Sequence, residues 1–494
     1  MKVSRRAFLA AAAAIAGSAA LPAARAALRG ERQRLRIPEL LDARKLGQSI
    51  ALEARAGTTA FFPGIDSATL GYNGAYLGPT IRVYSGDEVE MAIANRMAQP
   101  TTVHWHGLLV PGELDGGPHQ TIGPGATWRP ALAIRQPAAT LLYHSHLHHA
   151  TAAQVYSGLA GVMIVRDAAE EKLGLPSEYG IDDLPLVLQD RQFEGGRLVM
   201  RGGMTTAMQG TRGDTILVNG TPNAFARVPA RRVRLRLVNA SNARDYHLAF
   251  DDGRAFHWIA SEGGLLEAPL ERRSLQLSPG ERAEILVDFS DGAAASLVTG
   301  PDRNMPTMGM MGRASGSPAP FGLQTVLAFE AGPREGTPAP VPARLGVHEA
   351  WDASRAVRHR RFVLEMGMGM MGGGGMGMRG GTGDGMDLFS INGRAFDMAR
   401  IDERVRLGDL ETWEVSGDMM THPFHIHGVQ FRVLGRGPYG PGAQDAGLKD
   451  TVRVDQPVLL LVRFTQPASA APFMYHCHIL EHEDNGMMGQ FAAD

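Results

Sequence analysis

The sequence has little cysteine, no strong net charge and only a short apolar run at its start. Cys477 is the only cysteine among 494 residues, so the chain cannot form an internal disulfide. The apolar stretch at residues 7–21 is shorter than the roughly 20 residues that a membrane-spanning helix needs. The formal net charge is −2, which argues against a basic surface for nucleic acid. These absences exclude a disulfide-based scaffold and argue against a membrane anchor.

The first residues predict export by the twin-arginine route. Arg5 and Arg6 precede the apolar stretch, and small residues at Ala24 and Ala26 suit a cleavage site, so residues 1–26 are interpreted as a signal peptide. A disordered alanine-rich tail is the alternative. Removing residues 1–26 takes away four positive charges and no negative ones, which changes the net charge from −2 to −6. The mature chain is therefore expected in the periplasm, where a cysteine without a disulfide partner is available for another role.

The apolar pattern predicts strands, because few segments show the 3.6-residue period of a helix. In residues 87–93, Val89, Met91 and Ile93 alternate with polar residues. Residues 232–237 place arginines on one face and aliphatic residues on the other, and residues 284–289 form a short apolar run. A period of two is typical of half-buried strands. We therefore expect an all-β chain made of sandwiches.

The length of the mature chain suits about three domains of ordinary size. A polar segment at 168–177 and a Pro- and Gly-rich segment at 331–345 are the expected linkers. They place the domains at 45–168, 180–332 and 345–494. His-X-His pairs occur in the first and third of these domains and not in the middle one.

Five pairs of histidines are spaced two residues apart. Random placement of the 17 histidines would give about 0.6 such pairs by composition alone. On a strand, residues i and i+2 point to the same side and residue i+1 to the other. His476 and His478 are therefore expected on one side of a strand and Cys477 on the other. Such a strand could carry two metal centres, one on each face.

The donor atoms favour copper over zinc. A structural zinc site needs four ligands, whereas the clusters offer ten histidines, a thiolate and a methionine. Two histidines, one cysteine and a weak, distant methionine are the donor set of blue-copper sites. Met487, ten residues after Cys477, is the expected methionine, and the neighbouring Met488 is the alternative.

Four motifs resemble the copper motifs of the multicopper oxidase family, in the family's order. They are His-Trp-His-Gly at 104–107, His-Ser-His at 144–146, His-Pro-Phe-His-Ile-His-Gly at 422–428 and His-Cys-His-Ile-Leu-Glu-His-Glu-Asp-Asn-Gly-Met at 476–487. The resemblance implies three cupredoxin-like Greek-key β-sandwich domains. It also implies four copper ions: one type 1 ion in the third domain, and one type 2 and two type 3 ions between the first and third. The three-domain form needs no partner subunit, so a monomer is expected.

The same resemblance implies a role for each motif residue. Type 1 copper would be held by His422, Cys477 and His482, with Met487 as the axial ligand, and type 2 copper by His104 and His425. The type 3 ligands would be His106, His144, His146, His427, His476 and His478.

Two acids resemble the family's proton-relay groups. Asp115 lies in a loop eleven residues after His104, and Glu483 directly follows His482. Reduction of dioxygen to water consumes protons, which such acids could supply. The alternative for both is a loop carboxylate that accepts hydrogen bonds from backbone amides.

Methionine is concentrated in two glycine-containing stretches. Residues 366–386 contain seven methionines and residues 305–311 contain four. Thioether sulfur selects Cu(I), although a flexible linker is the alternative. The first stretch resembles the Met-rich insert of bacterial cuprous oxidases of the copper-efflux type. Asp418 and Met420 resemble the substrate-copper ligands of that group, and Glu365 and Met366 are further candidates for the same site.

These motifs together predict a cuprous oxidase with Cu(I) as reductant and dioxygen as acceptor. Small phenols would also be oxidised, more slowly if the Met-rich segment shields the type 1 site. A general laccase, in which the methionines are incidental, is one alternative. A periplasmic copper carrier without turnover is another, although a carrier needs no trinuclear cluster.

Overall fold

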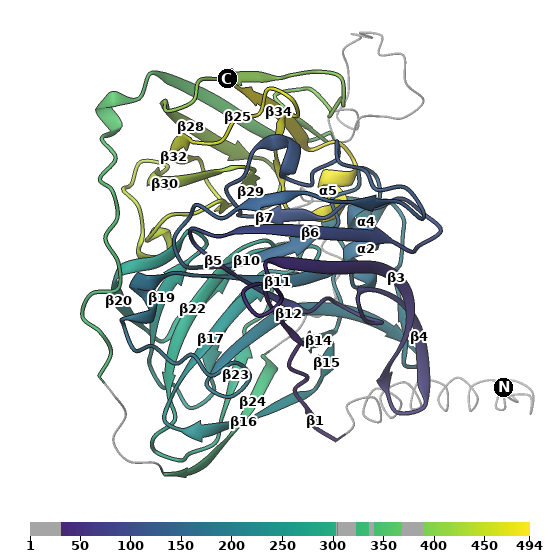
Figure 1. Cartoon of the computed structure of the whole chain (residues 1–494), viewed down its shortest axis with the longest axis vertical. Coiled ribbons are helices and arrows are strands. Elements are labelled where there is room, and N and C mark those ends of the chain that lie inside the picture. Colours follow the sequence, from purple (N-terminus) through teal and green to yellow (C-terminus); the bar gives the residue numbers. More distant parts are fainter. Residues whose placement is uncertain (1–30, 303, 305–322, 335–339, 368–388) are drawn as a thin grey trace, which may run out of the picture.

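The computed structural model describes residues 31–302, 304, 323–334, 340–367 and 389–494. They form six sheets arranged as three sandwiches that follow one another along the chain (Figure 1). The predicted all-β class is confirmed. Among the described residues, no helix is long and apolar enough to cross a membrane. The predicted signal peptide at 1–26 lies outside the described residues.

The first sandwich pairs two five-stranded sheets around a core that includes Ile50, Ile81 and Val89. One sheet has the order β2-β5-β11-β10-β7, with bounds Leu40–Asp42, Thr80–Tyr84, Ala160–Arg166, Ala139–His144 and His104–His106. The other contains β4 (Ile65–Tyr72), β3 (Ser49–Phe62), β6 (Glu88–Asn95), β8 (Thr127–Trp128) and β9 (Ala131–Ala133).

The middle sandwich contains an eight-stranded and a six-stranded sheet. The larger contains β15 (Thr221–Pro222), β14 (Thr215–Val218), β12 (Asp183–Glu194), β13 (Arg197–Val199), β17 (Arg232–Asn239), β22 (Arg282–Asp288), β19 (Phe256–Ser261) and β20 (Gly264–Arg272). The smaller contains β1 (Gln33–Arg34), β16 (Ala224–Ala230), β24 (Gln324–Arg334), β23 (Ala295–Thr299), β18 (Tyr246–Phe250) and β21 (Ser274–Leu277).

The third sandwich pairs two five-stranded sheets around the rings of Phe362, Trp413 and Tyr475. One sheet contains β26 (Phe389–Ile391), β25 (Arg358–Met366), β28 (Leu410–Gly417), β32 (Val458–Phe464) and β30 (Val429–Arg436). The other contains β27 (Glu403–Val405), β34 (Met488–Ala493), β33 (Phe473–Cys477), β29 (His422–Ile426) and β31 (Thr451–Val454).

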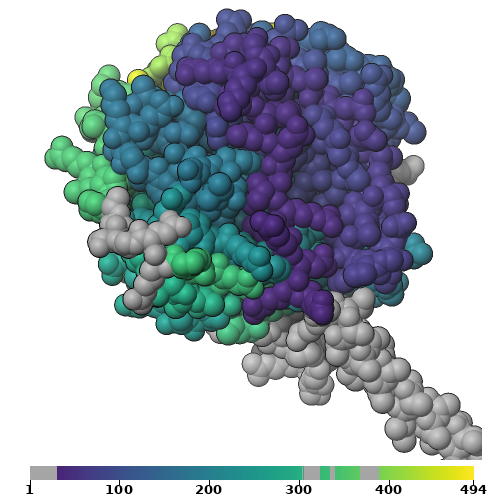
Figure 2. Space-filling view, turned by 60° about the horizontal axis from the view of Figure 1, so that its bottom comes forward, coloured from purple at the N-terminus to yellow at the C-terminus, as the bar shows by residue number. Residues whose placement is uncertain are grey.

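Strand β1 joins the start of the described chain to the middle sandwich. Gln33 and Arg34 pair in parallel with Ala224 and Phe225 of β16, although the chain then enters the first sandwich. Figure 2 shows this dark purple segment lying against the teal surface of the middle sandwich. The first and middle sandwiches are therefore connected by main-chain hydrogen bonds as well as by side-chain packing.

The strand predictions are confirmed in position, but one prediction of half burial is wrong. Val89, Met91 and Ile93 of β6 are fully buried, as the alternation indicates. In β17, however, Arg234 and Arg236 are buried as completely as the aliphatic residues. Arg236 also donates to Thr140 of the first sandwich. The charges of the two arginines are compensated by acids on the neighbouring strands β12 and β22 and on the segment that follows the first sandwich: Asp183, Glu284 and Glu170.

The helices are short and occur in the connections. The α-helices are α2 (Thr151–Ser157), α3 (Ala168–Glu171), α4 (Met204–Gln209) and α5 (Leu480–Asp484). Single 3-10 turns occur at Gly112–Leu114, Ala353–Arg355 and Ala443–Asp445. Helix α5 contacts both α2 of the first sandwich and α4 of the middle one (Figure 1). All three sandwiches therefore meet beside the motif that begins at His476.

Candidate metal centre

Strand β33 separates two groups of potential metal ligands. His476 and Cys477 are adjacent and fully buried, and their side chains enter different groups of donor atoms. On one side are His422, Cys477 and His482, and on the other His146, His427 and His476. In each group the donor atoms lie within 4.8 Å of one another. The structure therefore brings the predicted ligands together on two faces of one strand.

We call the set His422, Cys477 and His482 the thiol group. It is compact and lies within the third sandwich. Cys477 Sγ is 3.4 Å from His422 Nδ1 and 3.6 Å from His482 Nδ1. The amide of Ile479 donates a hydrogen bond to the same sulfur at 3.4 Å. Met487 is fully buried in the same core, and its carbonyl accepts from the amide of Cys477 at 3.1 Å. Met488 instead pairs with His476 across β33 and β34.

The other predicted histidine ligands form a second set, the histidine cluster, between the first and third sandwiches. Its members are His104, His106, His144, His146, His425, His427, His476 and His478. His146 Nε2 and His427 Nε2 each lie 3.2 Å from His476 Nε2, and His106 Nδ1 lies 3.4 Å from His144 Nε2. Two nitrogens that are each about 2.0 Å from one ion are about 3.3 Å apart at a near-tetrahedral angle. The observed spacing therefore fits nitrogens that converge on shared ions.

Two further nitrogens face the interior without a partner. His104 Nδ1 contacts the carbonyl of Asp115 at 3.1 Å, and His425 Nδ1 contacts that of Asp450 at 2.8 Å. The Nε2 atoms of His104 and His425 are buried and have no hydrogen-bond partner among the described residues. Buried polar atoms are almost always paired. Two such atoms from facing sandwiches fit a bound cation.

Burial lowers the pKa of nine predicted histidine ligands and so favours their neutral form. It lowers the pKa of His144 and His476 to about 3 and that of His422 to about 4. It also lowers the pKa of His482 in the thiol group. In the cluster it lowers the pKa of five further histidines: His106, His146, His425, His427 and His478. Metal binding requires the neutral imidazole and the thiolate. Burial raises the pKa of Cys477, so its thiolate needs a bound cation nearby.

Both predicted proton-relay acids contact the cluster. Asp115 Oδ2 lies 2.8 Å from His427 Nδ1 and 3.2 Å from His104 Nδ1. The Glu483 carboxylate lies 3.2 Å from His146 Nδ1 and 3.3 Å from His476 Nδ1. Burial, reinforced by the neighbouring Asp484, raises the pKa of Glu483 well above its usual value. Both acids are thus bound to the cluster rather than satisfied by backbone amides alone.

Sequence reasoning missed a third buried acid, Asp450. Its Oδ1 lies 3.1 Å from His106 Nε2, and its carboxylate accepts two hydrogen bonds from Arg282, at 2.7 and 2.6 Å. Asp450 belongs to the third sandwich, Arg282 to the middle one and His106 to the first. Because this contact depends on how three sandwiches dock, no local motif indicates it.

The residues predicted to bind the substrate copper lie near the thiol group. Asp418 Oδ1 accepts from the amide of Met366 at 3.0 Å, and the carbonyl of Asp418 contacts His422 Nε2 at 3.0 Å. Burial, with a contribution from the nearby charge of Glu365, raises the pKa of Asp418. The Met366 side chain is buried in the core and Met420 is half-buried. Most of the Met-rich stretch, residues 368–388, lies outside the described residues, as do residues 305–322.

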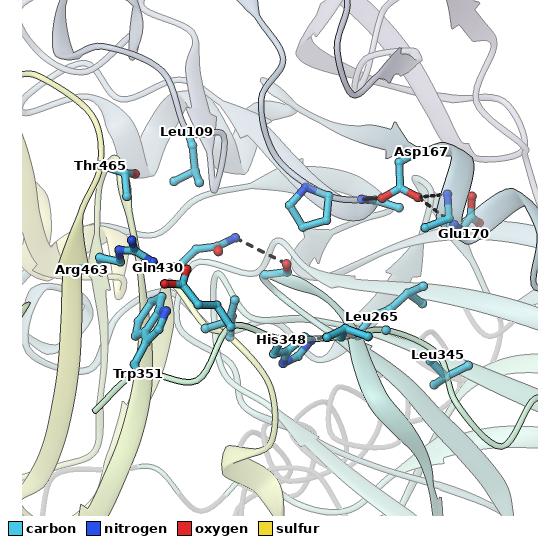
Figure 3. Close-up of a pocket in the computed structure, with 18 residues that line it drawn as sticks. Leu109, Asp167, Glu170, Leu265, Leu345, His348, Trp351, Gln430, Arg463 and Thr465 are labelled. Atoms are coloured by element: carbon cyan, nitrogen blue, oxygen red, sulfur yellow. Dashed lines mark hydrogen bonds and ion pairs between the residues drawn. The ribbon is translucent and has the colours of Figure 1, made fainter. Parts of the chain in front are cut away.

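A cavity of about 330 Å³ opens where the three sandwiches meet (Figure 3). Trp351, Gln430 and Arg463 lie on one side of it, and Leu265 and His348 lie below. None of the predicted copper ligands lines this cavity. It is therefore separate from both groups of donor atoms.

Comparison with known proteins identifies the family. Multicopper oxidase family models match residues 54–170, 188–296 and 376–494. The chain belongs to the multicopper oxidase family. Copper is therefore the metal that the family implies for the two groups of donor atoms.

The relatives carry different functional names. The cell division protein FtsP of Rahnella sp. is 39% identical over 498 residues, which cover 100% of this chain and 99% of the relative. The structure of a laccase-like multicopper oxidase CueO from Ochrobactrum sp. is 38% identical, with a TM-score of 0.82 over 93% of this chain and all of that one. A Campylobacter jejuni metallo-oxidase has 27% identity and a TM-score of 0.80, over 94% and 96% of the two chains.

Proposed function

We propose that the chain is a periplasmic oxidase that takes electrons from Cu(I) and transfers them to dioxygen. The observation that carries this proposal is the convergence of buried histidine and cysteine donor atoms in two groups, one on each side of β33. Export by the twin-arginine route and action as a monomer belong to the same proposal. Small phenols would be further reductants.

The proposed ligand assignment follows the two groups. His422, Cys477, His482 and Met487 would hold type 1 copper. His104 and His425 would hold type 2 copper: each has a buried Nε2 atom without a partner among the described residues, and a ring nitrogen of each lies within 4.8 Å of one of the other. Two type 3 ions would be held by the remaining motif histidines: His106, His144, His146, His427, His476 and His478.

Copper at these residues would supply one-electron chemistry at the thiolate and the reduction of dioxygen to water at the cluster. The chain supplies a short covalent connection between the two, since Cys477 is bonded through the backbone to both His476 and His478. The carbonyl of Cys477 also lies 3.0 Å from His476 Nδ1. Burial of all three side chains excludes water from this path.

Asp115 and Glu483 are proposed to hold and release protons at the cluster. Asp115 contacts histidines of both sandwiches, and Glu483 contacts one histidine from each. The raised pKa of Glu483 suits a group that carries a proton near neutral pH. The two acids contact different histidines, so each could serve a separate part of the cluster.

Cu(I) is favoured as substrate by the groups beside His422. Asp418 contacts His422 through its carbonyl, its carboxylate lies near Glu365, and Met420 packs against the core of the same sandwich, so carboxylate oxygen and thioether sulfur are available in this region. The amide of Met366 donates to the Asp418 carboxylate, and the Met366 side chain is buried in the same sandwich. The Campylobacter jejuni relative is called a metallo-oxidase. The Ochrobactrum relative, with activity towards lignin model compounds, keeps a general laccase as the alternative.

A role in cell division is a second candidate, favoured by the identity of 39% to FtsP along the whole chain. Such a role could require only the folded surface. If Cys477→Ser restores division in a strain that lacks this protein, the division role is independent of copper chemistry. This candidate and the oxidase proposal make separate predictions and can be tested side by side.

Oxygen consumption by the copper-loaded protein tests the oxidase proposal, with Cu(I) as the only reductant. A carrier without turnover would consume no oxygen beyond the copper-catalysed background. Deleting residues 368–386, which keeps Met366 of β25, should lower kcat/KM for Cu(I) and raise it for a bulky dimethoxyphenol. Replacing the methionines at 368–386 by serine keeps the segment length and should lower only the Cu(I) value. An unchanged ratio between the two substrates in both variants would contradict the cuprous oxidase assignment.

A further inference from the structure

The two histidines of the thiol group are held at their outer nitrogens by main-chain carbonyls. With Nδ1 directed toward Cys477 Sγ, Nε2 of each ring carries the proton and donates. His422 donates to the carbonyl of Asp418 at 3.0 Å, and His482 donates to that of Met208 at 3.2 Å. Asp418 belongs to the third sandwich, but Met208 lies in α4 of the middle one. The middle sandwich, which supplies no predicted ligand, therefore orients one of them.

A single buried guanidinium fixes the segment that carries Met208. Arg212 donates to the carbonyl of Gln209, the residue after Met208 at the end of α4. It also donates to the carbonyl of Ala243 at 2.9 Å and to Asp302 Oδ2 at 2.7 Å. Gly210, between these residues, has a φ of +73°, and a Cβ there would lie 2.7 Å from Ile479 Cγ2. The segment is thus held directly against the chain that leaves Cys477.

The same guanidinium reaches the side of His422. It donates to the carbonyl of Asn304 at 2.8 Å. The Asn304 side chain in turn clamps Thr421, accepting from its amide at 2.8 Å and donating to its carbonyl at 2.9 Å. Thr421 directly precedes His422. The Arg212 side chain thus connects the segment that holds His482 with the residue that precedes His422. Arg212 itself lies outside the sandwich that carries these two histidines.

We propose that Arg212 is a positioning residue for the thiolate copper site and sets the orientation of His422 and His482 from the middle sandwich. This inference rests on the proposed function, because it assumes that copper binds at Cys477. Groups that hold the second nitrogen of a ligating histidine fix its ring orientation and its basicity. Loss of Arg212 should therefore change the copper site without removing any ligand.

The experiment compares full-length copper-loaded variants Arg212→Lys and Arg212→Gln with Arg191→Lys. Arg191 is a matched control: it is buried in the middle sandwich and donates to three carbonyls, those of Val155, Tyr156 and Asp190. The readouts are the thiolate-to-copper absorption band, the copper hyperfine splitting, the reduction potential and copper retention against a chelator. Thermal unfolding of each copper-free variant measures the purely structural loss.

Arg212→Lys should shift the band and the potential and weaken copper retention at this site by about 10- to 100-fold. Arg191→Lys should leave all three unchanged, even if it lowers the unfolding temperature equally. Unchanged spectra in both Arg212 variants would overturn the inference. Asn304→Ala releases Thr421 without removing a charge, so it should give a smaller shift of the same kind and replaces the Arg212 variants if they do not fold. Wild-type protein that shows no thiolate-to-copper band would instead contradict the proposed function.

Discussion

The thiol group and the histidine cluster share β33 but depend on the rest of the molecule in different ways. All four predicted residues of the thiol group, including Met487, come from the third sandwich. The cluster takes four histidines from the first sandwich and four from the third: His104, His106, His144 and His146, and His425, His427, His476 and His478. The thiol group can therefore be assembled within one sandwich, whereas the cluster exists only when two sandwiches are docked.

The middle sandwich supports both groups, at different points. Arg282 binds Asp450, which contacts His106 of the cluster. Arg212 and the carbonyl of Met208 instead support the thiol group. A sandwich without predicted ligands thus supplies one arginine beside each proposed copper site. Variants on the two sides should separate the sites experimentally.

The largest effect is expected from removing the only thiol. Cys477→Ser should abolish the thiolate-to-copper band, and oxygen uptake should fall to the level of copper-free protein, because no electron-accepting site remains. Much of the cluster copper should stay bound, since none of the eight cluster histidines is changed. Metal analysis, absorption spectra and an oxygen electrode give the three readouts. Oxidase activity retained in this variant would overturn the assignment of Cys477.

Acid should destabilise the copper-free protein through the cluster. Burial lowers the pKa of His144 and His476 to about 3, below the value of about 6.5 in the unfolded chain. The unfolded chain therefore binds protons first, so stability is fully present above about pH 6.5 and is lost as the pH falls toward 3. At pH 4.5 each of these histidines should cost about 2–3 kcal/mol.

Denaturant unfolding of the copper-free protein at pH 7 and pH 4.5 measures this loss. His476→Gln removes one titrating group and should show a smaller difference between the two pH values. The same midpoint at both pH values in the parent protein would refute the prediction. Because burial lowers the pKa of seven histidines in the cluster and of two in the thiol group, docking of the sandwiches should be the more acid-sensitive property.

Removing a proton carrier should slow turnover while leaving both copper sites filled. Glu483→Gln keeps the shape of the side chain but cannot exchange a proton, so oxygen uptake should fall by about 100-fold or more. The thiolate-to-copper band should be retained, because the histidines that the Glu483 carboxylate contacts, His146 and His476, belong to the cluster and not to the thiol group. Glu171→Gln, an exposed acid on α3, is the control and should leave turnover unchanged. Equal rates for Glu483→Gln and the parent would assign Glu483 a structural role.

The sequence contained enough information to predict the strands and the two faces of β33, but not their surroundings. Spacing of two residues is a local property, so alternation at Val89 and the His476–His478 pair could be interpreted directly. Three other features depend on segments far apart in sequence that meet only in the folded chain: the burial of Arg234, the contact of Asp450 with His106, and the contact of the Met208 carbonyl with His482. Arg234 has the alternating pattern of a solvent-facing strand, and only the facing acids of other elements explain its burial.

The smallest expected effect comes from a single methyl group at Gly280. This glycine of the middle sandwich has a φ of +83°, and a Cβ there would lie 2.8 Å from His478 Cδ2 and 3.1 Å from His106 Cε1. Gly280→Ala should therefore displace two cluster histidines and weaken cluster copper retention by about 10-fold, with the thiolate-to-copper band unchanged. Gly253→Ala is the matched control, because its φ of +73° imposes similar backbone strain and nothing lies within 4 Å of its Cβ. If Gly280→Ala shifts the band as strongly as it weakens the cluster, the two sites are not independently supported, and the contrast between them fails.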